Sequence, residues 1–413
     1  MFYKKSYSNS GAYPRRSSGS SGPSRRGNTG GKGRGGFKSS NIDPALFVKK
    51  AVEAKNDVAY VPTLSFETLP VDKRIIDLLL KKGYTNPTPI QDKAIVPIVE
   101  GKDVVGIANT GTGKTAAFLI PLIHNLLASP NEKVLIMVPT RELATQIHTE
   151  FMSLSSGLRL HATVCVGGVY IGKQIKDLKY QTNILIGTPG RIKDLIERKA
   201  LNLTSYTKLV LDEADRMLDM GFIADMRSII SKMPADHQTL FFSATLSEEI
   251  KKVIGEFLRK PEMISVKTGE TSHYVDQDVV EYAHKDEKIE TLHAILLKEE
   301  VSKTIIFGKT KHGVESLRES LQMRGVEAVS LHGDKNFSKR QHALAQFKTN
   351  KVSVLVATDV AARGIDVRDI SHVINYDLPA TYDDYVHRIG RTGRGGDRGT
   401  ALTFVEKRRT TRY

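Results

Sequence analysis

The sequence has little cysteine: Cys165 is the single thiol among 413 residues, so no intramolecular disulfide can form. It lies in the apolar run 162–166, where a buried structural thiol is more common than a reactive one. A chain without disulfides fits a reducing, intracellular environment. We therefore expect a cytoplasmic protein.

Long apolar runs are also missing. No segment approaches the roughly 20 apolar residues of a membrane span, so we expect no membrane partner. Lys4 and Lys5 are not followed by an apolar segment, and we expect no secretory signal. The remaining composition is ordinary for a globular protein, with 40% hydrophobic and 26% charged residues. The length of 413 residues allows two or three domains.

Acidic residues are absent before Asp43, where four Lys and five Arg carry +9 of the net charge of +15. An excess of positive charge favours a polyanionic partner, either nucleic acid or an anionic surface. Residues 1–40 are rich in Gly, Ser and Arg with almost no aliphatic residue, so we expect a disordered basic tail. Segments 25–27 and 34–37 are similar to RGG-type RNA-binding segments. A flexible solubilising tail fits equally well.

From residue 64 onward, short apolar runs alternate with amphipathic helical patterns. This alternation predicts the α/β fold class, with parallel sheets covered by helices on both faces. The polar stretch 263–276 indicates a linker between two such domains. The expected organisation is a tail over 1–40, a short helix (41–55) and connector over 41–63, a first domain over 64–262 and a second over 277–413. The predicted strands are 104–108, 134–138, 162–166, 184–187, 209–212, 239–243, 304–307, 328–331, 352–357, 372–376 and 400–405.

Three carboxylates follow one predicted strand within four residues: Asp212, Glu213 and Asp215. A parallel strand places the residues that follow it at the carboxyl edge of its sheet, where open α/β folds bind ligands. One carboxylate there can hold Mg²⁺, and a neighbour can orient or deprotonate a water. Taken alone, a solvated acidic turn is the more common meaning of this pattern.

A glycine-rich loop over 108–115 supplies the partner that the acidic cluster needs. It follows the predicted strand 104–108 and precedes an apolar helical run, which is the context of a phosphate-binding loop. Gly111 and Gly113 let backbone N–H groups turn toward phosphate oxygens, and the following helix N-terminus favours anions. Lys114 would reach the β- and γ-phosphates, and Thr115 would bind Mg²⁺. The loop departs from the usual pattern in having Ala108 where a glycine is common.

Together, the loop and the sequence Asp212-Glu213-Ala214-Asp215 resemble the signatures of the DEAD-box ATP-dependent RNA helicases. The resemblance covers nearly everything from Phe66 to Arg394, with motifs in the family's order, and the chain is similar to short bacterial RhlE-like members. It implies two tandem RecA-like domains, ATP and Mg²⁺ as cofactors, and RNA as a partner held mainly through its backbone. It also implies a monomer.

The resemblance implies a role for each matching residue at the nucleotide. Gln91, in a Q motif over 64–92, would read the adenine edge, and Asp212 would hold Mg²⁺ with Thr115 while Glu213 positions the attacking water. The catalytic set is Lys114, Asp212, Glu213, Arg391 and Arg394, the arginines reaching the γ-phosphate. The nucleotide-binding set is Phe66, Tyr84, Gln91, Thr110, Gly111, Thr112, Gly113, Lys114, Thr115 and Asp366.

The resemblance also implies RNA contacts and a coupling set. The RNA set is Pro139, Thr140, Arg141, Gly168, Thr188, Pro189, Gly190, Arg191, Gly333, Asp334, Thr358 and Arg363. The set expected to couple hydrolysis to strand separation is Asp215, Ser243, Thr245 and His387. One position departs from the family: Phe337 stands where glutamine is usual, three residues before Arg340, which weakens the expectation of an RNA or interdomain contact there.

The predicted function is ATP-dependent local unwinding of short RNA duplexes or remodelling of RNA–protein complexes by a two-domain clamp. ATP would bridge the domains, and the closed form would bend one RNA strand. Two alternatives stay open: a DNA-acting helicase of the same superfamily, and a non-catalytic RNA-binding clamp. The sequence does not identify the physiological RNA or the protein partners.

Overall fold

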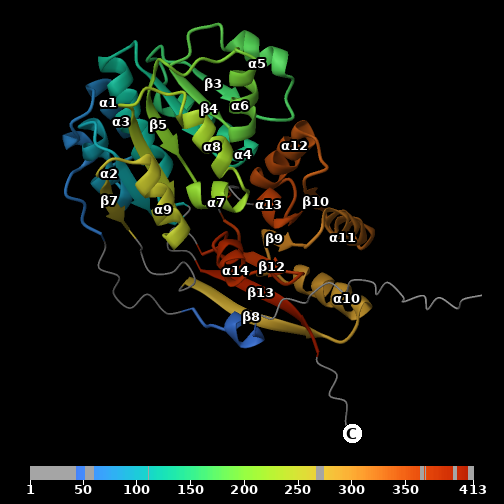
Figure 1. Ribbon diagram of the computed structural model, residues 1–413. Coiled ribbons are helices and arrows are strands. Elements are labelled where there is room, and N and C mark those ends of the chain that lie inside the picture. Colours follow the sequence, from blue (N-terminus) through green and yellow to red (C-terminus); the bar gives the residue numbers. More distant parts are fainter. Residues whose placement is uncertain are drawn as a thin grey trace, which may run out of the picture. The chain divides into compact units, whose positions relative to one another are not determined.

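The computed structural model describes residues 43–51, 60–109, 111–266, 274–362, 367, 369–393 and 398–407 (Figure 1). The predicted tail over 1–40 and four predicted site residues, Thr110, Arg363, Asp366 and Arg394, lie outside this range. The described chain forms two parallel sheets, each with helices on both faces. This is the predicted α/β architecture.

The first sheet contains, within the described residues, seven parallel strands in the order β3-β4-β2-β5-β6-β1-β7. The strands are β1 (Val104–Ile107), β2 (Lys133–Met137), β3 (Ala162–Cys165), β4 (Ile184–Gly187), β5 (Tyr206–Leu211), β6 (Gln238–Ser243) and β7 (Glu262–Ser265). The helical elements are η2 (Phe66–Thr68), α1 (Lys73–Lys81), α2 (Pro89–Val99), α3 (Lys114–Ala128), α4 (Arg141–Leu154), α5 (Ile171–Asp177), α6 (Pro189–Glu197), α7 (Ala214–Asp219), α8 (Ile223–Ile230) and α9 (Glu248–Phe257).

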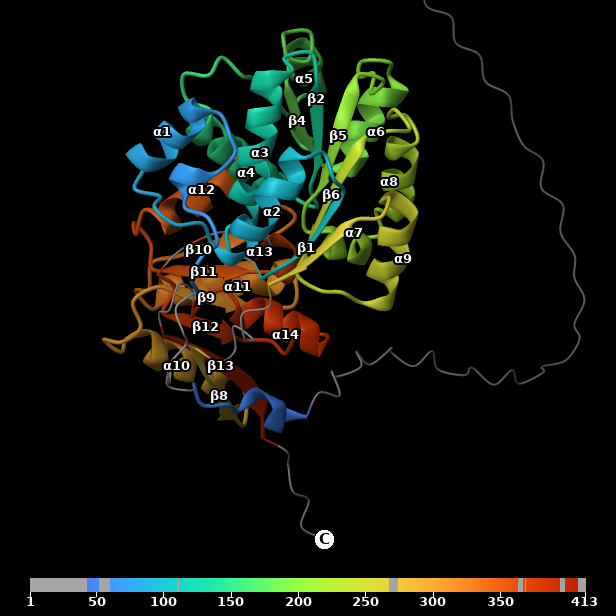
Figure 2. The same ribbon diagram turned by 90° about the vertical axis from the view of Figure 1, so that its left-hand side faces the viewer.

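Successive residues of the central strands enter two different cores, because side chains alternate across a strand. Val104 and Leu240 belong to the core beneath α1 to α4, whereas Val105 and Phe241 belong to the core beneath α6, α8 and α9. Figure 2 shows these two helical layers on opposite sides of the strands. Both faces are therefore covered, as continuous apolar strand sequences predict.

The second sheet contains, within the described residues, six parallel strands in the order β10-β11-β9-β12-β13-β8. The strands are β8 (Val275–Tyr282), β9 (Thr304–Phe307), β10 (Ala328–Leu331), β11 (Val354–Ala357), β12 (His372–Asn375) and β13 (Gly399–Glu406). The helices are α10 (Lys285–Leu296), α11 (Lys311–Met323), α12 (Phe337–Lys348), α13 (Asp359–Ala362) and α14 (Tyr382–Ile389).

The domain boundaries stay a prediction, but two elements bear on how they are drawn. The predicted linker over 263–276 begins inside β7, which pairs with β1, and ends inside β8. Residues 267–273 between these strands lie outside the described range.

The segment before the first domain differs from the expected helix over 41–55. Its described residues form a four-residue 3₁₀ turn, η1 (Pro44–Phe47), with Pro44 in its first turn as predicted. The Asp43 side chain caps this turn by accepting a hydrogen bond from the Ala45 amide at 3.0 Å. The backbone then becomes extended, and Lys49 pairs with Gln277 of β8.

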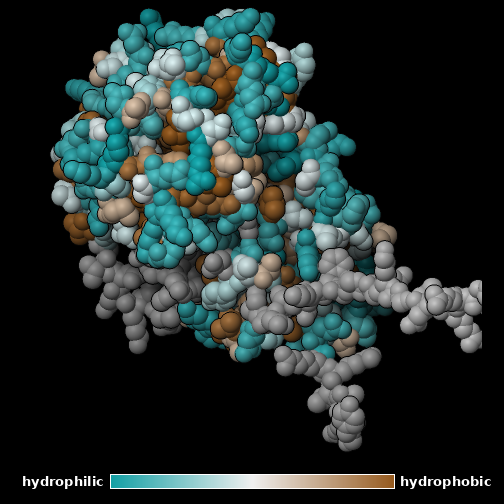
Figure 3. All heavy atoms as spheres, in the orientation of Figure 1, coloured by the Kyte–Doolittle hydropathy of each residue, from teal (hydrophilic) through white to brown (hydrophobic). Residues whose placement is uncertain are grey.

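Hydrophilic side chains cover much of the face drawn in Figure 3, with apolar side chains scattered between them. None of the helices in the described part of the chain has the length and apolar character needed to cross a membrane.

Candidate nucleotide and RNA site

The phosphate loop joins β1 to α3 and depends on one glycine conformation. Gly113 has φ +92°, in the left-handed region that favours glycine. A Cβ at this position would lie 2.5 Å from Nε2 of Gln91 and 3.0 Å from Oγ1 of Thr88. Gly111 also has a positive φ, of 85°. The loop therefore needs glycine at Gly113 for both conformation and space.

Lys114 begins α3 and is buried, with its ammonium group donating a 2.8 Å hydrogen bond to the Ala108 carbonyl oxygen. The positive charge of Lys114 therefore lies next to the phosphate loop that precedes α3. The Thr112 hydroxyl donates a 2.8 Å hydrogen bond to the Asn109 carbonyl oxygen, and Thr115 is half-buried in the first turn of α3. The helix N-terminus and the lysine together make this loop attractive to an anion.

Gln91 connects the loop to the preceding helix. Its side-chain oxygen accepts a 2.9 Å hydrogen bond from the Thr88 amide, which forms part of a capping box at the start of α2. Its side-chain nitrogen donates a 3.1 Å hydrogen bond to the Gly113 carbonyl oxygen. The predicted adenine-side aromatics lie together, with the rings of buried Phe66 and exposed Tyr84 edge to face at 6.1 Å.

Asp212 follows β5 and is buried beside the loop. Burial raises the pKa of its carboxyl to about 6, although the charge of Lys114 acts in the opposite direction. Its Oδ1 accepts a 2.9 Å hydrogen bond from the Glu213 amide. A buried carboxylate whose ionised form is disfavoured gains from a nearby cation, and carboxylate and hydroxyl oxygens are ligands that Mg²⁺ accepts. Asp212 and Thr115 therefore fit the predicted metal.

The described residues hold no group of three or more His, Cys, Asp or Glu side chains arranged for a metal ion. This finding is compatible with Mg²⁺, because protein sites for Mg²⁺ with nucleotides use one or two side chains together with phosphate oxygens and water.

Glu213 adopts a left-handed backbone conformation, with φ 51° and ψ 49°. A non-glycine residue rarely occupies this region, and such strain is concentrated at functional sites. The Glu213 side chain is buried and forms a 2.9 Å ion pair with Arg216. Arg216 in turn donates a 3.0 Å hydrogen bond to the Val360 carbonyl oxygen, at α13 of the second sheet.

Asp215, of the predicted coupling set, contacts the segment at the end of β6 that carries two other members of that set, Ser243 and Thr245. Its Oδ2 accepts hydrogen bonds from the Ala244 amide at 2.9 Å, the Thr245 amide at 3.0 Å and the Thr245 hydroxyl at 3.3 Å. Ser243 joins this arrangement through Thr245, whose carbonyl oxygen accepts a 2.9 Å hydrogen bond from the Ser243 hydroxyl. Asp215 thus lies with Ser243 and Thr245 at the end of β6.

Two predicted RNA-binding arginines of the first domain converge on one loop. The guanidinium of Arg141 lies over Gly168, where a Cβ would be 2.0 Å from Nη1 of the arginine. Arg191 donates a 3.1 Å hydrogen bond to the Val169 carbonyl oxygen. The other predicted residues of this set belong to the turns that start α4 and α6: Pro139, Thr140, Thr188, Pro189 and Gly190.

A third arginine, Arg340 of helix α12 in the second domain, lies close to Arg141. Arg340 forms a 2.9 Å ion pair with buried Glu142. Burial, together with the positive charges of Arg340 and Arg191, lowers the pKa of Arg141. Because like charges gathered in one place attract an anion, this cluster favours a phosphate backbone. Phe337, at the departure from the family pattern, is the first residue of α12 and is half-buried.

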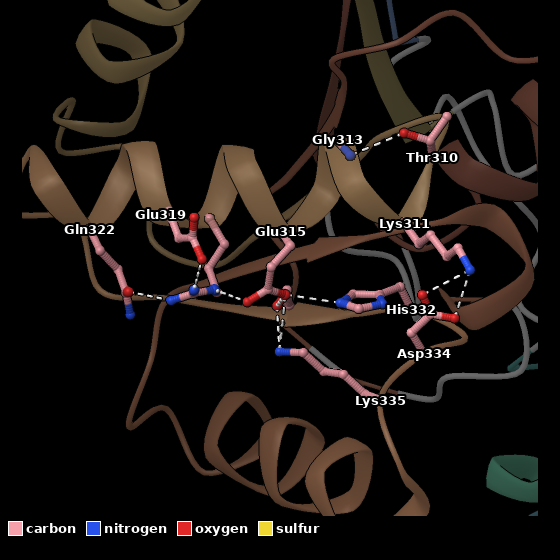
Figure 4. A network of polar contacts seen from close by, with 11 residues as sticks. Thr310, Lys311, Gly313, Glu315, Glu319, Gln322, His332, Asp334 and Lys335 are labelled. Carbon is pink, nitrogen blue, oxygen red and sulfur yellow. Dashed lines mark hydrogen bonds and ion pairs between the residues drawn. The ribbon is translucent and has the colours of Figure 1, made fainter. Parts of the chain in front are cut away.

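Gly333 and Asp334 follow β10 next to the polar network drawn in Figure 4. Asp334 forms a 2.8 Å ion pair with Lys311, and Glu315 of α11 lies at the network's centre. Glu315 accepts hydrogen bonds from Ser330 at 2.6 Å and from His332 at 2.9 Å, and Lys335 lies 3.4 Å away. The network thus fixes the turn that carries Gly333 and Asp334.

The arginine-rich side of the predicted site lies on α14 and the turn after it. Arg388 is buried and clamps Asp359 with hydrogen bonds of 2.6 and 2.8 Å, and it donates a 3.2 Å bond to Asn375. Arg391 is buried one turn later, and His387 is half-buried. The Thr358 amide donates a 3.2 Å hydrogen bond to the Leu331 carbonyl oxygen, beside the start of α13.

Comparisons with known proteins identify the family of this chain. Two family descriptions match the chain: DEAD/DEAH box helicase over residues 88–253, and helicase conserved C-terminal domain over residues 287–396. The DEAD-box ATP-dependent RNA helicase CshA of Bacillus subtilis is 43% identical over 348 residues, covering 84% of this chain and 70% of the relative. The chain belongs to the DEAD-box helicase family.

Two further comparisons place the chain within the DEAD-box family. The ATP-dependent RNA helicase CshA of Listeria monocytogenes is 44% identical over 344 residues, covering 83% of this chain and 66% of the relative. This chain thus spans about two thirds of that relative's length. The structure of S. cerevisiae Dbp5 bound to RNA and ADP BeF3 is similar with a TM-score of 0.74 and 27% identity, over 83% of this chain and 90% of that chain. The RhlE-like subgroup stays a prediction.

Sequence reasoning missed several residues that organise this DEAD-box site. Arg216 lies one helical turn after Glu213, a spacing that could have indicated their ion pair. Arg388 lies three residues before the predicted Arg391, but only the fold brings Asp359 and Asn375 to it. No pattern in the sequence indicated the role of Glu315, because its partners lie on a different element, β10, and on the turn that follows it.

Proposed function

We propose that this chain binds ATP with Mg²⁺ and RNA, hydrolyses ATP, and locally unwinds short RNA duplexes or remodels RNA–protein complexes. The observation that carries the proposal is a convergence at the carboxyl ends of the neighbouring strands β1, β5 and β6. These ends bear the phosphate loop, Asp212 and the Asp215–Thr245 contact. We further propose that it acts in the cytoplasm as a monomer.

The nucleotide would be held mainly by the first domain. The adenine would lie at Gln91, whose position is fixed by its bonds to Thr88 and Gly113. The phosphates would lie on the loop, with Lys114 turning from the Ala108 carbonyl oxygen to the β- and γ-phosphates. Thr115 and Asp212 would hold Mg²⁺, which supplies positive charge against the phosphate oxygens.

Glu213 would orient and accept a proton from the attacking water. Its present ion pair with Arg216 holds the carboxylate in one position, at the end of β5 beside Asp212. From the second domain, Arg391 and Arg394 would stabilise charge on the γ-phosphate, and Asp366 would contact the ribose. Arg388 holds the helix before these arginines.

RNA would be held through its phosphates by Arg141 and Arg191, and Gly168 lets the guanidinium of Arg141 lie over the loop. The Arg340–Glu142 ion pair lies beside these arginines. Asp215 would carry a change at the nucleotide to Ser243 and Thr245, through its hydrogen bonds from Ala244 and Thr245. His387 is assigned to the same coupling set on the second domain.

The test is the variant Glu213→Gln, which removes the carboxylate charge and keeps the side chain's size. Expected are retained ATP and RNA binding and a loss of RNA-stimulated turnover of at least about a hundredfold, in the range of a lost general base. The control is Glu248→Gln, whose side chain is 81% exposed. Normal turnover in Glu213→Gln would refute the role of Glu213.

The alternatives have their own outcomes in the same assay. Equal stimulation of wild-type ATPase by single-stranded DNA and RNA would support a DNA-acting helicase. A wild-type protein that binds RNA but shows no ATPase activity at saturating RNA would support a non-catalytic clamp.

A further inference from the structure

A short segment before the first domain in sequence packs on the second sheet. Residues 43–51 lie beside β8, as the blue turn next to this strand shows in Figures 1 and 2. β8 is an edge strand of its sheet, so one row of its backbone groups needs a partner. The segment supplies part of that partner.

Phe47 anchors the segment in a core of the second sheet. Its side chain is 0% exposed, and its ring lies 4.7 Å from that of Tyr385. The same core contains Val275 of β8, Ile389 of α14 and Ala401 of β13. The neighbours of Phe47 point elsewhere, since Leu46 and Val48 are 53% and 52% exposed. One aromatic side chain thus provides the apolar contact.

Hydrogen bonds fix the position of this anchor. The Lys49 amide donates to the Gln277 carbonyl oxygen at 3.1 Å, and the Gln277 amide donates to the Lys49 carbonyl oxygen at 2.8 Å. The Ala51 amide donates to Oδ1 of Asp276 at 3.0 Å. The buried Gln277 side chain accepts a 2.9 Å hydrogen bond from the Tyr385 hydroxyl, so the strand and α14 are joined at the place where the segment docks.

This docking reaches the arginine side of the proposed site through α14. Tyr385 and Ile389, four residues apart, form the face of α14 toward Phe47. Arg388 leaves the same helix toward Asp359 and Asn375. The helix is therefore held from two directions, by Phe47 on one and by the Arg388 bonds on the other. Arg391 lies in the turn that directly follows it.

We propose that residues 43–51 are a docking segment of the second domain, and that Phe47 is a positioning residue for α14 and Arg391. The proposal rests on the proposed ATPase function. Phe47 contacts no nucleotide or RNA; it acts by keeping α14 in the place from which Arg391 reaches the γ-phosphate. Its loss slows the hydrolytic step and leaves ATP binding to the phosphate loop and Gln91 unchanged.

The experiment compares Phe47→Ala, Phe47→Leu and the control Leu46→Ala in the full-length chain. For Phe47→Ala, we expect the RNA-stimulated kcat to fall about tenfold, because small misplacement of a catalytic group has effects of this order. The KM for ATP and the affinity for a fluorescent ATP analogue stay within about twofold. Phe47→Leu recovers most of kcat, and Leu46→Ala matches wild type.

A second measurement separates this proposal from the proposed function. Hydrogen exchange of the α14 amides should be faster in Phe47→Ala than in wild type, whether or not the protein hydrolyses ATP. Unchanged exchange overturns the docking. Faster exchange with unchanged kcat overturns the positioning role, and so does a raised KM with unchanged kcat. A wild-type protein without RNA-stimulated ATPase refutes the proposed function alone.

Discussion

Gly113 illustrates how one backbone position controls the phosphate loop. Its left-handed conformation turns the loop into α3, and the Gln91 amide occupies the space where a side chain would begin. A side chain at position 113 would therefore have to adopt a left-handed backbone conformation. It would also have to displace the Gln91 amide, which donates a hydrogen bond to the Gly113 carbonyl oxygen.

We therefore predict that Gly113→Ala lowers ATP affinity by at least about tenfold, since strain of 1–3 kcal/mol is stored at such a position. Isothermal titration calorimetry with ATP would measure it. The matched control is Gly255→Ala: Gly255 is exposed in α9, with nothing within 4 Å of the added Cβ. That change should leave ATP affinity unchanged and stabilise the helix slightly. Equal ATP affinities in both variants would contradict the loop's dependence on glycine.

Glu315 gives a pH dependence at the scale of one carboxyl group. Burial raises its pKa, but hydrogen bonds from Ser330 and His332 and the charge of Lys335 outweigh burial and lower it to about 2. The unfolded value is about 4.3. A carboxyl group with a lowered folded pKa stabilises the fold above its unfolded pKa, and this contribution is lost as pH falls from about 5 to 2.

Glu315→Gln should thus destabilise the second domain at pH 7 by about 1–2 kcal/mol, after allowance for screening of a partly exposed group. The difference from wild type should shrink below pH 4. Urea unfolding at several pH values, followed by circular dichroism, measures it. Glu299→Gln, at an exposed position, serves as the control. A difference that stays constant between pH 7 and pH 3 would rule out this explanation.

At the scale of elements, the strands followed closely from the sequence. Predicted strand 239–243 lies within β6 (Gln238–Ser243), and predicted strand 304–307 coincides with β9. Both strands are buried along their whole length and have continuous apolar centres, Leu240–Phe242 and Ile305–Phe307, which is the pattern that predicted them. The phosphate loop was equally clear, because glycine and lysine spacing is local to the chain.

Elements whose structure depends on distant partners were not predicted. The segment around Phe47 carries helical spacing, yet it becomes a 3₁₀ turn and an extended stretch because β8 offers hydrogen-bond partners to Lys49. The Arg388–Asp359 pair likewise depends on how α14 packs against α13. Tertiary contacts decide such cases over local propensity.

At the scale of the whole molecule, positive charge is unevenly distributed along the chain. The residues before Asp43 hold +9 of the net charge of +15. Within the described residues, Arg141, Arg191 and Arg340 lie together, and burial together with the charges of Arg340 and Arg191 lowers the pKa of Arg141. RNA affinity should accordingly have two electrostatic components, one from the tail and one from the folded surface.

Because residues 43–51 are docked on the second sheet, two stretches of chain connect the two domains instead of one. One connection runs from Val266 to Tyr274, and a second runs from Ala51, on the second sheet, to Tyr60. Tyr60 is held on the first domain by a 2.5 Å hydrogen bond to Asp92, next to Gln91. Each connection can extend at most about 30 Å. The chain therefore closes a ring through a non-covalent contact.

A ring with two short tethers limits how far its halves can separate and raises their effective concentration toward each other. We predict that fluorescence energy transfer between dyes on the two domains, without ATP or RNA, shows a narrower distance distribution in wild type than in Phe47→Ala. Leu46→Ala should match wild type. Identical distributions in all three proteins would show that the docked segment does not limit the distance between the two domains. If the distribution is narrower in wild type than in Phe47→Ala, Phe47 limits how far the two domains can separate when neither ATP nor RNA is bound.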